Sequence, residues 1–407
     1  MAVAKGTTES ELKEAERGLQ QWAPVLDDLS HVWKEPDHSR LWWDDYYKVF
    51  TTSNSRHTYS GLFGKWAPLR GWKTIRFGLG KLRRLCSVDR WSGPFQLDVP
   101  VSSDAVIIPL RVNEGIIVAS FHEDKVLKVV SGRKSGLLQN DRQAWKYAIQ
   151  AGVESHIPRV FNFGQQEMHS HWILTEFAPN THPLHQPFVT QAIISSKSRH
   201  ERWRRWLEVK ILPFLVDIYK ESRCKTLNSQ MYIRHLQELV EVHPFSHKLK
   251  PLLQHVERAA SVGECGAVVI ANLHGDLKPE HVHRSYNTWK IIDWGNGFNG
   301  SVLFDLIHYF LFRSPFRDIN SQAGRSDWSW VSGKAPLIRT TKNLQSYVRL
   351  YARWLKEWKG IQLSVEAVRF HMLGMLLEHF CARGKLPGND FSLSDSLAVK
   401  WLSTIEQ

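Results

Sequence analysis

Runs of β-branched residues in the first half of the chain predict short strands. Four runs have this character, at 106–110, 115–121, 125–130 and 171–177. Between the third and the fourth, residues 137–151 carry apolar side chains at helical spacing, among them Ala144, Trp145 and Ala148. Strands, one helix and a further strand together predict a small α+β unit.

The second half of the chain has the pattern of helices. Apolar residues recur at helical spacing over 201–222, 232–242, 247–260, 344–358 and 365–381. Pro213 is expected to kink or split the first of these helices. Two short apolar runs, 267–271 and 289–292, predict strands, and each leads directly into a polar motif. The whole pattern predicts an α+β protein with a small, mostly β N-terminal lobe and a larger helical C-terminal lobe.

Residues 1–95 differ from the rest and are interpreted as a basic, aromatic N-terminal extension. Thr8 to Glu11 has the pattern of a helix capping box. Residues 64–84 interleave basic and aromatic side chains. That mixture is typical of membrane-surface segments, of grooves for single-stranded nucleic acid and of basic helices that cover a neighbouring domain. The predicted organisation is the extension, a first lobe over 96–180 and a helical lobe over 181–407.

Composition narrows the class of protein. The chain of 407 residues has 18 Trp, 19 Phe and 43% hydrophobic residues, which argues against disorder. Its four cysteines form no CxxC pair, so neither a zinc site nor a disulfide framework is expected. The sequence has no apolar signal region and no apolar run of membrane-spanning length, which favours a cytoplasmic protein, soluble or peripheral to the inner face of the membrane. The formal net charge of +13 favours acidic ligands, including nucleotides, nucleic acid, anionic lipid and phosphorylated glycans.

Candidate chemistry is concentrated in two motifs at the ends of the predicted strands. The first motif is His274-Gly-Asp-Leu-Lys-Pro-Glu-His281, and the second is Lys290-Ile-Ile-Asp-Trp-Gly295. Phosphoryl transfer needs one carboxylate that meets the acceptor hydroxyl and another that holds Mg²⁺ against the nucleotide phosphates. Asp276 and Asp293 are therefore the candidate pair.

This pair of motifs resembles the catalytic segment of the aminoglycoside phosphotransferase and choline kinase-like family, within the protein-kinase-like superfamily. The family pattern is HGDxxxxN, followed by a strand and IDW or DFG. The resemblance implies a two-lobed kinase-like fold in which Asp276 is the catalytic residue and Asp293 a metal ligand. The Leu-Lys-Pro-Glu segment also resembles the HRDLKPEN loop of eukaryotic kinases, which implies that Lys278 touches the transferred phosphate.

One position departs from the family pattern. The metal-binding Asn of the pattern is His281 in this chain. Imidazole is a poorer ligand for Mg²⁺ than an amide oxygen. Three consequences stay open: His281 tolerates a softer metal such as Mn²⁺, the metal is held mainly by Asp293 and water, or catalysis is weakened.

The resemblance extends to the first lobe. Lys128 resembles the lysine of the third kinase strand, whose ammonium bridges the α- and β-phosphates. A glutamate partner on the next helix is not evident, since only Gln143 and Asp141 lie near the expected place. Residues 175–179 resemble the interlobe hinge, so the backbone groups of Glu176 and Ala178 are expected to bond the adenine edge.

Other polar residues are interpreted as structural. Asp305 matches a recurrent family position, and we expect it to fix a helix start near the catalytic loop. His274 is interpreted as a residue that braces this loop. The remaining histidines have no metal-ligand spacing and are interpreted as ordinary surface or core residues.

The expected reaction moves the γ-phosphoryl group of ATP, or of GTP, to a hydroxyl of a small molecule or saccharide, with Mg²⁺ or Mn²⁺ as the metal. The basic chain argues against a cationic aminoglycoside as acceptor, and the layout also resembles uncharacterised proteins of surface-glycan synthesis. Residues 64–84 would then rest on an anionic membrane. The alternatives are an aminoglycoside kinase and, because of His281, a catalytically impaired scaffold that binds nucleotide. Nucleic-acid binding would leave the kinase motifs unexplained, and the sequence leaves the oligomeric state open.

Overall fold

The structure is a computed structural model. It describes residues 9–52, 91–178, 204–313 and 337–383, apart from gaps at 35, 38–40, 45–48, 96–99, 111–113, 121, 167–169, 245, 262–263, 279–280 and 285–287. The chain folds into two compact units, Met1–Arg199 with Val282–Gly295 and His200–His281 with Asn296–Gln407. The basic segment 64–84 lies outside the described residues, so its membrane contact stays a prediction.

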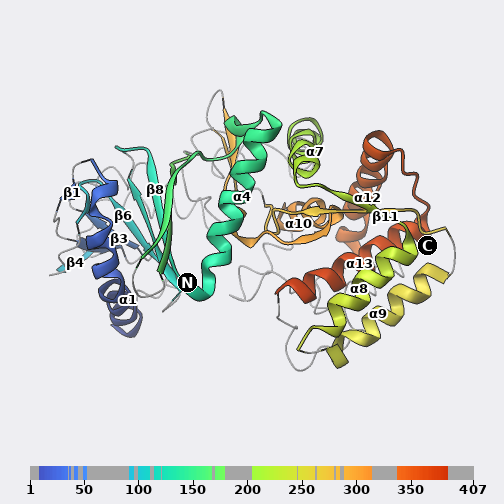
Figure 1. Ribbon diagram of the computed structural model, residues 1–407, viewed down its shortest axis with the longest axis horizontal. Helices are drawn as coiled ribbons and strands as arrows, with labels where there is room; N and C mark the ends of the chain where they lie inside the picture. Colours follow the sequence, from blue (N-terminus) through green and yellow to red (C-terminus); the bar gives the residue numbers. More distant parts are fainter. Residues whose placement is uncertain are drawn as a thin grey trace. The chain divides into compact units, whose positions relative to one another are not determined.

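An antiparallel sheet forms the centre of the first unit (Figure 1). Among the described residues it has eight strands in the order β4-β2-β3-β6-β7-β8-β10-β9. Their bounds are β2 Leu41–Asp44, β3 Val49–Thr52, β4 Trp91–Phe95, β6 Val106–Pro109, β7 Gly115–Ser120, β8 Lys125–Ser131, β9 Val160–Gln166 and β10 Ser170–Glu176. A separate short pair joins β1 (Pro36–Asp37) to β5 (Val101–Ser102). The strands predicted from the β-branched runs are all present.

Part of the N-terminal extension is built into this sheet. Strand β3 pairs with β6, with Phe50 opposite Ile107, and β2 and β4 continue the sheet beyond β3. Trp43 of β2 and Phe50 of β3 are buried, and they pack edge-on with ring centroids 4.9 Å apart. The sequence leaves open whether residues 1–95 dock on the core, and their described part does so. The predicted boundaries at 95 and 180 stay predictions.

Two helices, α1 (Glu9–Asp28) and α4 (Ser135–Ala151), cover opposite faces of the sheet. Alternate residues of a strand point to opposite faces. Accordingly, Leu127 and Val129 of β8 belong to the core cluster of α1, whereas Val130 packs with Leu138 of α4. Lys128 shares the face of Val130, and the sheet therefore directs its ammonium group towards α4.

A hairpin of β13 (Val282–Arg284) and β14 (Trp289–Ile291) also belongs to the first unit. The ring of His156 stacks on Trp289 with centroids 3.9 Å apart, and its Nδ1 lies 3.1 Å from the Trp289 carbonyl oxygen. The Nζ of Lys290 lies 2.8 Å from a carboxylate oxygen of Glu176. These contacts fix the hairpin against the strand end at Glu176 and so position Asp293, which follows β14.

The second unit is mainly helical, as the sequence predicts. Its elements are α7 Leu212–Glu221, β11 Lys225–Leu227, α8 Ser229–Glu241, α9 Ser246–Ser261, β12 Val268–Asn272, β15 Asn299–Ser301, α10 Leu303–Arg313, α12 Leu337–Lys359 and α13 Val365–Arg383. Pro213 stands in the first turn of α7, directly after a π-helical turn over Leu207–Ile211. The residues on either side of the junction keep helical backbone angles, so the helix continues through Pro213 and the predicted split does not occur. Strands β11, β12 and β15 form a small sheet beside α13. Within the described residues, no helix combines the length and apolarity that a membrane crossing requires.

Candidate active site

The loop that carries Asp276 leaves β12 through a turn that only glycine fits. Gly275 has a φ of 74°, and a Cβ on it would lie 2.1 Å from the Asn296 carbonyl oxygen. The buried carboxylate of Asp305 accepts hydrogen bonds from the backbone amides of His274 (2.8 Å) and Gly275 (2.9 Å). It also accepts one from the Tyr219 hydroxyl (2.8 Å). The sequence predicts that Asp305 fixes a helix start, and its carboxylate instead holds the backbone of the loop that carries Asp276.

Asp305 should make stability depend on pH. Burial raises the pKa of this carboxyl to about 6, against hydrogen bonds that favour the charged form. Its contribution to stability is then fully present below about pH 4 and is lost as the pH rises through 6. In urea unfolding, we expect the stability advantage of wild type over Asp305→Asn to fall by about 2 kcal/mol between pH 4.5 and 7. A stability advantage of wild type that grows with pH would contradict this role of Asp305.

Lys278 and His308 contact different oxygens of the Asp276 carboxylate. The Nζ of Lys278 lies 3.0 Å from Oδ2, and its contact with a transferred phosphate stays a prediction. The Nε2 of His308 lies 3.5 Å from Oδ1, and its Nδ1 lies 2.9 Å from the Leu277 carbonyl oxygen. Because that carbonyl only accepts, Nδ1 is the donor, and the ring is held in one orientation. The described contacts thus fix both carboxylate oxygens.

The sequence interpretation missed His308, which it treats as an ordinary histidine. His308 is buried on α10, three residues after Asp305. Residues at that spacing lie on the same face of a helix, so one face of α10 contacts the loop that carries Asp276 through both side chains. The spacing Asp305–His308 was the signal that could have revealed it.

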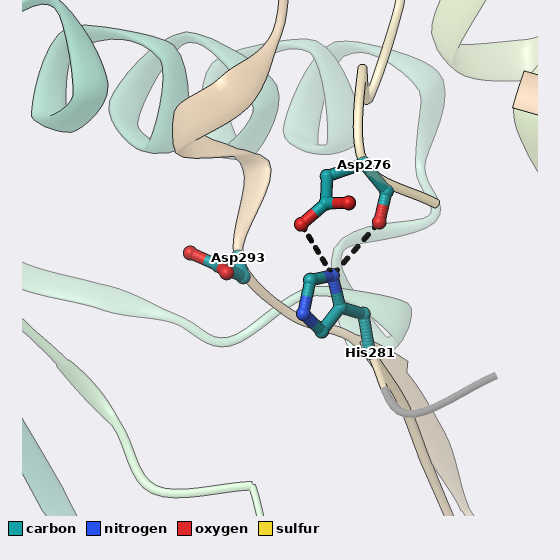
Figure 2. Close-up of side chains that lie close together, drawn as sticks. All are labelled: Asp276, His281 and Asp293. Carbon is teal, nitrogen blue, oxygen red and sulfur yellow. Dashed lines mark hydrogen bonds and ion pairs between the residues drawn. The ribbon is translucent and has the colours of Figure 1, made fainter. Parts of the chain in front are cut away.

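His281 directs a defined nitrogen away from the loop backbone. Its Nδ1 lies 2.9 Å from the Asp276 carbonyl oxygen and 3.8 Å from the Asp276 carboxylate, the two dashed lines in Figure 2. A carbonyl oxygen only accepts, so Nδ1 carries the proton and the ring lone pair lies on Nε2. A neutral imidazole in this tautomer is a competent metal ligand through Nε2.

In the first unit, Lys128 connects a strand, a helix and the turn after β14. Its Nζ lies 3.0 Å from the Asp141 carboxylate on α4 and 3.4 Å from the Asp293 carboxylate. Burial lowers the pKa of Lys128, but the two carboxylates more than offset this and raise it above its usual value. Lys128 is therefore a permanent cation. Asp141 supplies the helix partner for which the sequence shows no glutamate, and Gln143 does not take that place.

Asp293 has an unusual backbone conformation. Its φ is 63°, in the left-handed region, which Asp tolerates better than most residues but which is still sparsely populated. The turn is secured from α4, because the Asn140 side-chain amide donates to the Gly295 carbonyl oxygen (3.0 Å). Gly295 also lies so close to α4 that a Cβ on it would be 3.2 Å from the Leu137 carbonyl oxygen. The strained turn presents the carboxylate beside Lys128.

Removing the Asp141 carboxylate should weaken this arrangement. In Asp141→Asn the Lys128 ammonium loses its contact with the Asp141 carboxylate, keeps the one with Asp293, and stays largely buried. We expect the free energy of unfolding to fall by about 1–3 kcal/mol, the cost of losing a charged hydrogen bond. Urea unfolding measures it, with Gln143→Ala as the matched control on the same helix. If Asp141→Asn and Gln143→Ala lowered the free energy of unfolding equally, the loss would reflect a general change on α4 and not the Asp141–Lys128 contact.

The predicted hinge residues lie at the end of β10. The Glu176 amide donates to the Arg159 carbonyl oxygen (2.8 Å), and the Phe177 amide donates to the Asp124 carbonyl oxygen (2.7 Å). The Ala178 carbonyl oxygen lies 2.5 Å from the Nδ1 of His283. Burial lowers the pKa of His283 to about 4, so this ring is neutral at pH 7. That these backbone groups bind adenine stays a prediction.

The candidate metal ligands carry suitable donor atoms. They are Asp276 and His281 of the second unit and Asp293 of the first unit, all drawn in Figure 2. Carboxylates suit Mg²⁺ and Mn²⁺, and the imidazole widens the choice towards ions that accept nitrogen. The donor chemistry fits the divalent ion that the sequence predicts, and the assignment of Asp293 and His281 as ligands stays a prediction.

Comparison with known proteins gives structural matches only. No protein-family model and no curated protein matches the sequence. Among solved structures, an aminoglycoside-3'-phosphotransferase of type VIII is 20% identical over 67% of this chain and 90% of that chain, with a TM-score of 0.34. Choline kinase LicA from Streptococcus pneumoniae is 16% identical over 82% of this chain and 99% of that one, at 0.38. A glucosamine kinase in complex with glucosamine, ADP and inorganic phosphate is 9% identical over 74% and 80%, at 0.37.

The chain therefore has structural matches among aminoglycoside phosphotransferases and choline kinases, at low identity. These are the two groups that its motifs resemble. Since every one of the three TM-scores is below 0.5, the matches decide neither substrate nor mechanism.

Proposed function

We propose that the chain is a phosphotransferase that moves the γ-phosphoryl group of ATP to a hydroxyl of a small molecule or saccharide. The main support for this proposal is that two carboxylates, those of Asp141 and Asp293, contact the ammonium group of Lys128. Phosphoryl transfer in kinases depends on a strand lysine paired with an acidic helix residue, together with a metal-binding aspartate. Lys128 contacts an acidic residue of each kind, Asp141 at 3.0 Å and Asp293 at 3.4 Å.

Backbone groups at the end of β10 would hold the nucleobase. The N–H and C=O of one strand residue point to the same side. The Phe177 amide bonds towards β8 at Asp124, so the carbonyl of Glu176 and the amide of Ala178 point to the opposite side. They offer an acceptor and a donor to a purine, while Lys128 binds the α- and β-phosphates.

Asp276 would act on the acceptor. In the proposed step, the acceptor oxygen bonds to the γ-phosphorus, the bond between that phosphorus and the β,γ-bridging oxygen breaks, and the hydroxyl proton passes to an Asp276 carboxylate oxygen. ADP leaves. Lys278, 3.0 Å from Asp276, neutralises charge on the transferred group, and His308 keeps the carboxylate oriented.

A divalent metal ion fits this scheme, with Asp293 and the Nε2 of His281 as its proposed protein ligands. When bound, such an ion neutralises charge on the phosphate oxygens and orients the phosphates. Mn²⁺ suits a mixed set of oxygen and nitrogen donors better than Mg²⁺ does. We therefore expect turnover with Mn²⁺ to be at least equal to turnover with Mg²⁺.

The acceptor class follows from charge. The chain has 53 Lys and Arg against 40 Asp and Glu, which disfavours a polycationic acceptor such as an aminoglycoside. A neutral or anionic hydroxyl compound, including a saccharide of a surface glycan, is compatible with this balance. Membrane contact through residues 64–84 would bring the enzyme to a lipid-linked acceptor.

An acceptor screen tests the proposed function. The purified full chain is incubated with ATP or GTP and Mg²⁺ or Mn²⁺, with separate pools of neutral sugars, amino sugars, choline-like alcohols and aminoglycosides. ADP or GDP release and the gain of one phosphoryl group by an acceptor are measured. Phosphorylation of a sugar pool supports the proposal, and phosphorylation of aminoglycosides alone would replace its acceptor class. Nucleotide binding without turnover under either metal would make the chain a nucleotide-binding scaffold.

A further inference from the structure

The strand after the catalytic loop contacts the predicted hinge directly. His283 of β13 is buried, and its Nδ1 lies 2.5 Å from the carbonyl oxygen of Ala178. A backbone carbonyl has no proton to give, so the imidazole Nδ1–H is the donor. The Ala178 carbonyl therefore already accepts a hydrogen bond from within the first unit.

If Lys128 binds the phosphates, residues 176–178 lie at a suitable distance to bind the nucleobase. Lys128 stands opposite Ile173 in the pairing of β8 with β10, and Glu176 lies three residues further along β10. At the rise of a β-strand this places the hinge about 10 Å from the level of Lys128, the scale of one nucleoside. The base would then meet residues 176–178 while the phosphates meet the ammonium group.

The hydrogen-bonding pattern at the hinge matches adenine. The Glu176 carbonyl is an acceptor and the Ala178 amide is a donor, and both point away from β8. The outer edge of adenine presents the N6 amino group as a donor and N1 as an acceptor. Each hinge group therefore meets a complementary group of the base.

Guanine has the reverse pattern on the same edge. Its O6 is an acceptor and its N1–H a donor, so in the adenine pose both would face groups of the same kind. A shifted pose would pair O6 with the Ala178 amide, but N1–H would then need the Ala178 carbonyl. That oxygen already accepts from His283, whose buried ring also occupies space beside it. The N1–H of guanine then either shares the Ala178 carbonyl oxygen with His283 or has no acceptor, and both outcomes lower the affinity for guanine.

We propose that His283 makes the nucleotide site select ATP over GTP, by occupying the hinge carbonyl that guanine would require. The inference rests on the proposed function, because it takes residues 176–178 as the base-binding segment. It answers the choice between ATP and GTP that the sequence leaves open. His283 acts here as a specificity-determining residue through Ala178, without touching the reacting atoms.

Binding of non-hydrolysable ATP and GTP analogues, measured by calorimetry with Mg²⁺, tests this inference. Wild type should bind the ATP analogue at least about tenfold more tightly, the value of one hydrogen bond. In His283→Leu the Ala178 carbonyl becomes available to guanine, and the preference should shrink by about tenfold. His283→Asn places an amide N–H near the position of Nδ1 and should keep the wild-type preference.

A matched control separates selectivity from packing. His156 makes the same kind of bond in the same unit, from Nδ1 to the carbonyl oxygen of Trp289 at 3.1 Å, away from the hinge. His156→Leu should leave the preference unchanged. A wild-type preference near one, or an unchanged preference in His283→Leu, would overturn the inference even if the chain is a phosphotransferase. Failure of wild type to bind either analogue would instead sink the proposed function.

Discussion

Asp276→Asn should abolish most phosphoryl transfer and leave nucleotide binding intact. The substitution keeps the size of the side chain but removes the group that accepts the hydroxyl proton. General bases contribute about 10²–10⁴-fold, so we expect kcat to fall by that factor. The groups proposed to bind the base and the α- and β-phosphates, residues 176–178 and Lys128, belong to the first unit, so the KM for nucleotide should stay within about threefold of wild type. Steady-state ADP release with the acceptor found in the screen measures both constants.

The control for this change is Asp217→Asn. Asp217 is an exposed residue of α7 that contacts Lys220 on the helix surface, in the same unit as Asp276. It should have wild-type kinetics. A kcat within about threefold of wild type for Asp276→Asn would remove this residue from the chemical step. A rise in KM with kcat unchanged would assign it to binding instead.

Asp293→Asn should make the reaction depend on much higher metal concentrations. The neutral amide is a weaker ligand than a carboxylate, and losing metal assistance is worth several kcal/mol. We expect kcat/KM for the nucleotide to fall on the order of 10³-fold. The metal concentration for half-maximal turnover should rise at least about tenfold. Titration of Mg²⁺ and Mn²⁺ in the same ADP-release assay gives both quantities.

Asp141→Asn is the matched control for the metal prediction. Both substitutions remove a carboxylate from Lys128, but in our proposal only Asp293 binds the metal. Asp141→Asn should therefore keep the wild-type metal requirement even where it lowers stability or activity. A similar rise in both variants would mean that the effect comes from Lys128, and Asp293 would lose its role as a ligand.

Much of the candidate site could be predicted because it lies on continuous motifs. The loop around Asp276, the strand before Asp293 and the lysine on β8 each follow from a few neighbouring residues and their spacing. The sequence predicts that Pro213 kinks or splits its helix, but the proline sits in the first turn of α7, where its missing N–H costs little, and the helix continues. The mixed α+β class is confirmed by an antiparallel sheet followed by helices.

The missed residues act through tertiary contacts that a linear pattern does not contain. Asp141 becomes the partner of Lys128 because α4 packs on the face of β8 that carries this lysine. His308 gains its place because α10 packs under the catalytic loop, and His283 because its hairpin closes on the strand end at Ala178. A single His or Asp in the sequence does not by itself distinguish a residue of the site from an ordinary surface residue.

The N-terminal strands were the least predictable part of the fold. Residues 49–52 find their partner in β6, with a long intervening stretch of sequence between them. Such a pairing is chosen by which sheet edge is available and by which face is buried. Local composition indicates an aromatic extension, and only the partner strand turns it into part of the sheet.

That construction has a consequence for how the protein is made. Synthesis from the N-terminus delivers α1 and β2–β4 before the ribosome has produced β6, β7 and β8. Leu19, Trp22 and Leu26 on the apolar face of α1 pack in one cluster with Ile116 and Val118. That face stays partly uncovered until these later residues have been synthesised. Non-local pairings of this kind form late and leave apolar surface exposed meanwhile. During this period the exposed apolar surface of α1 and β2–β4 is the kind of surface that chaperones bind.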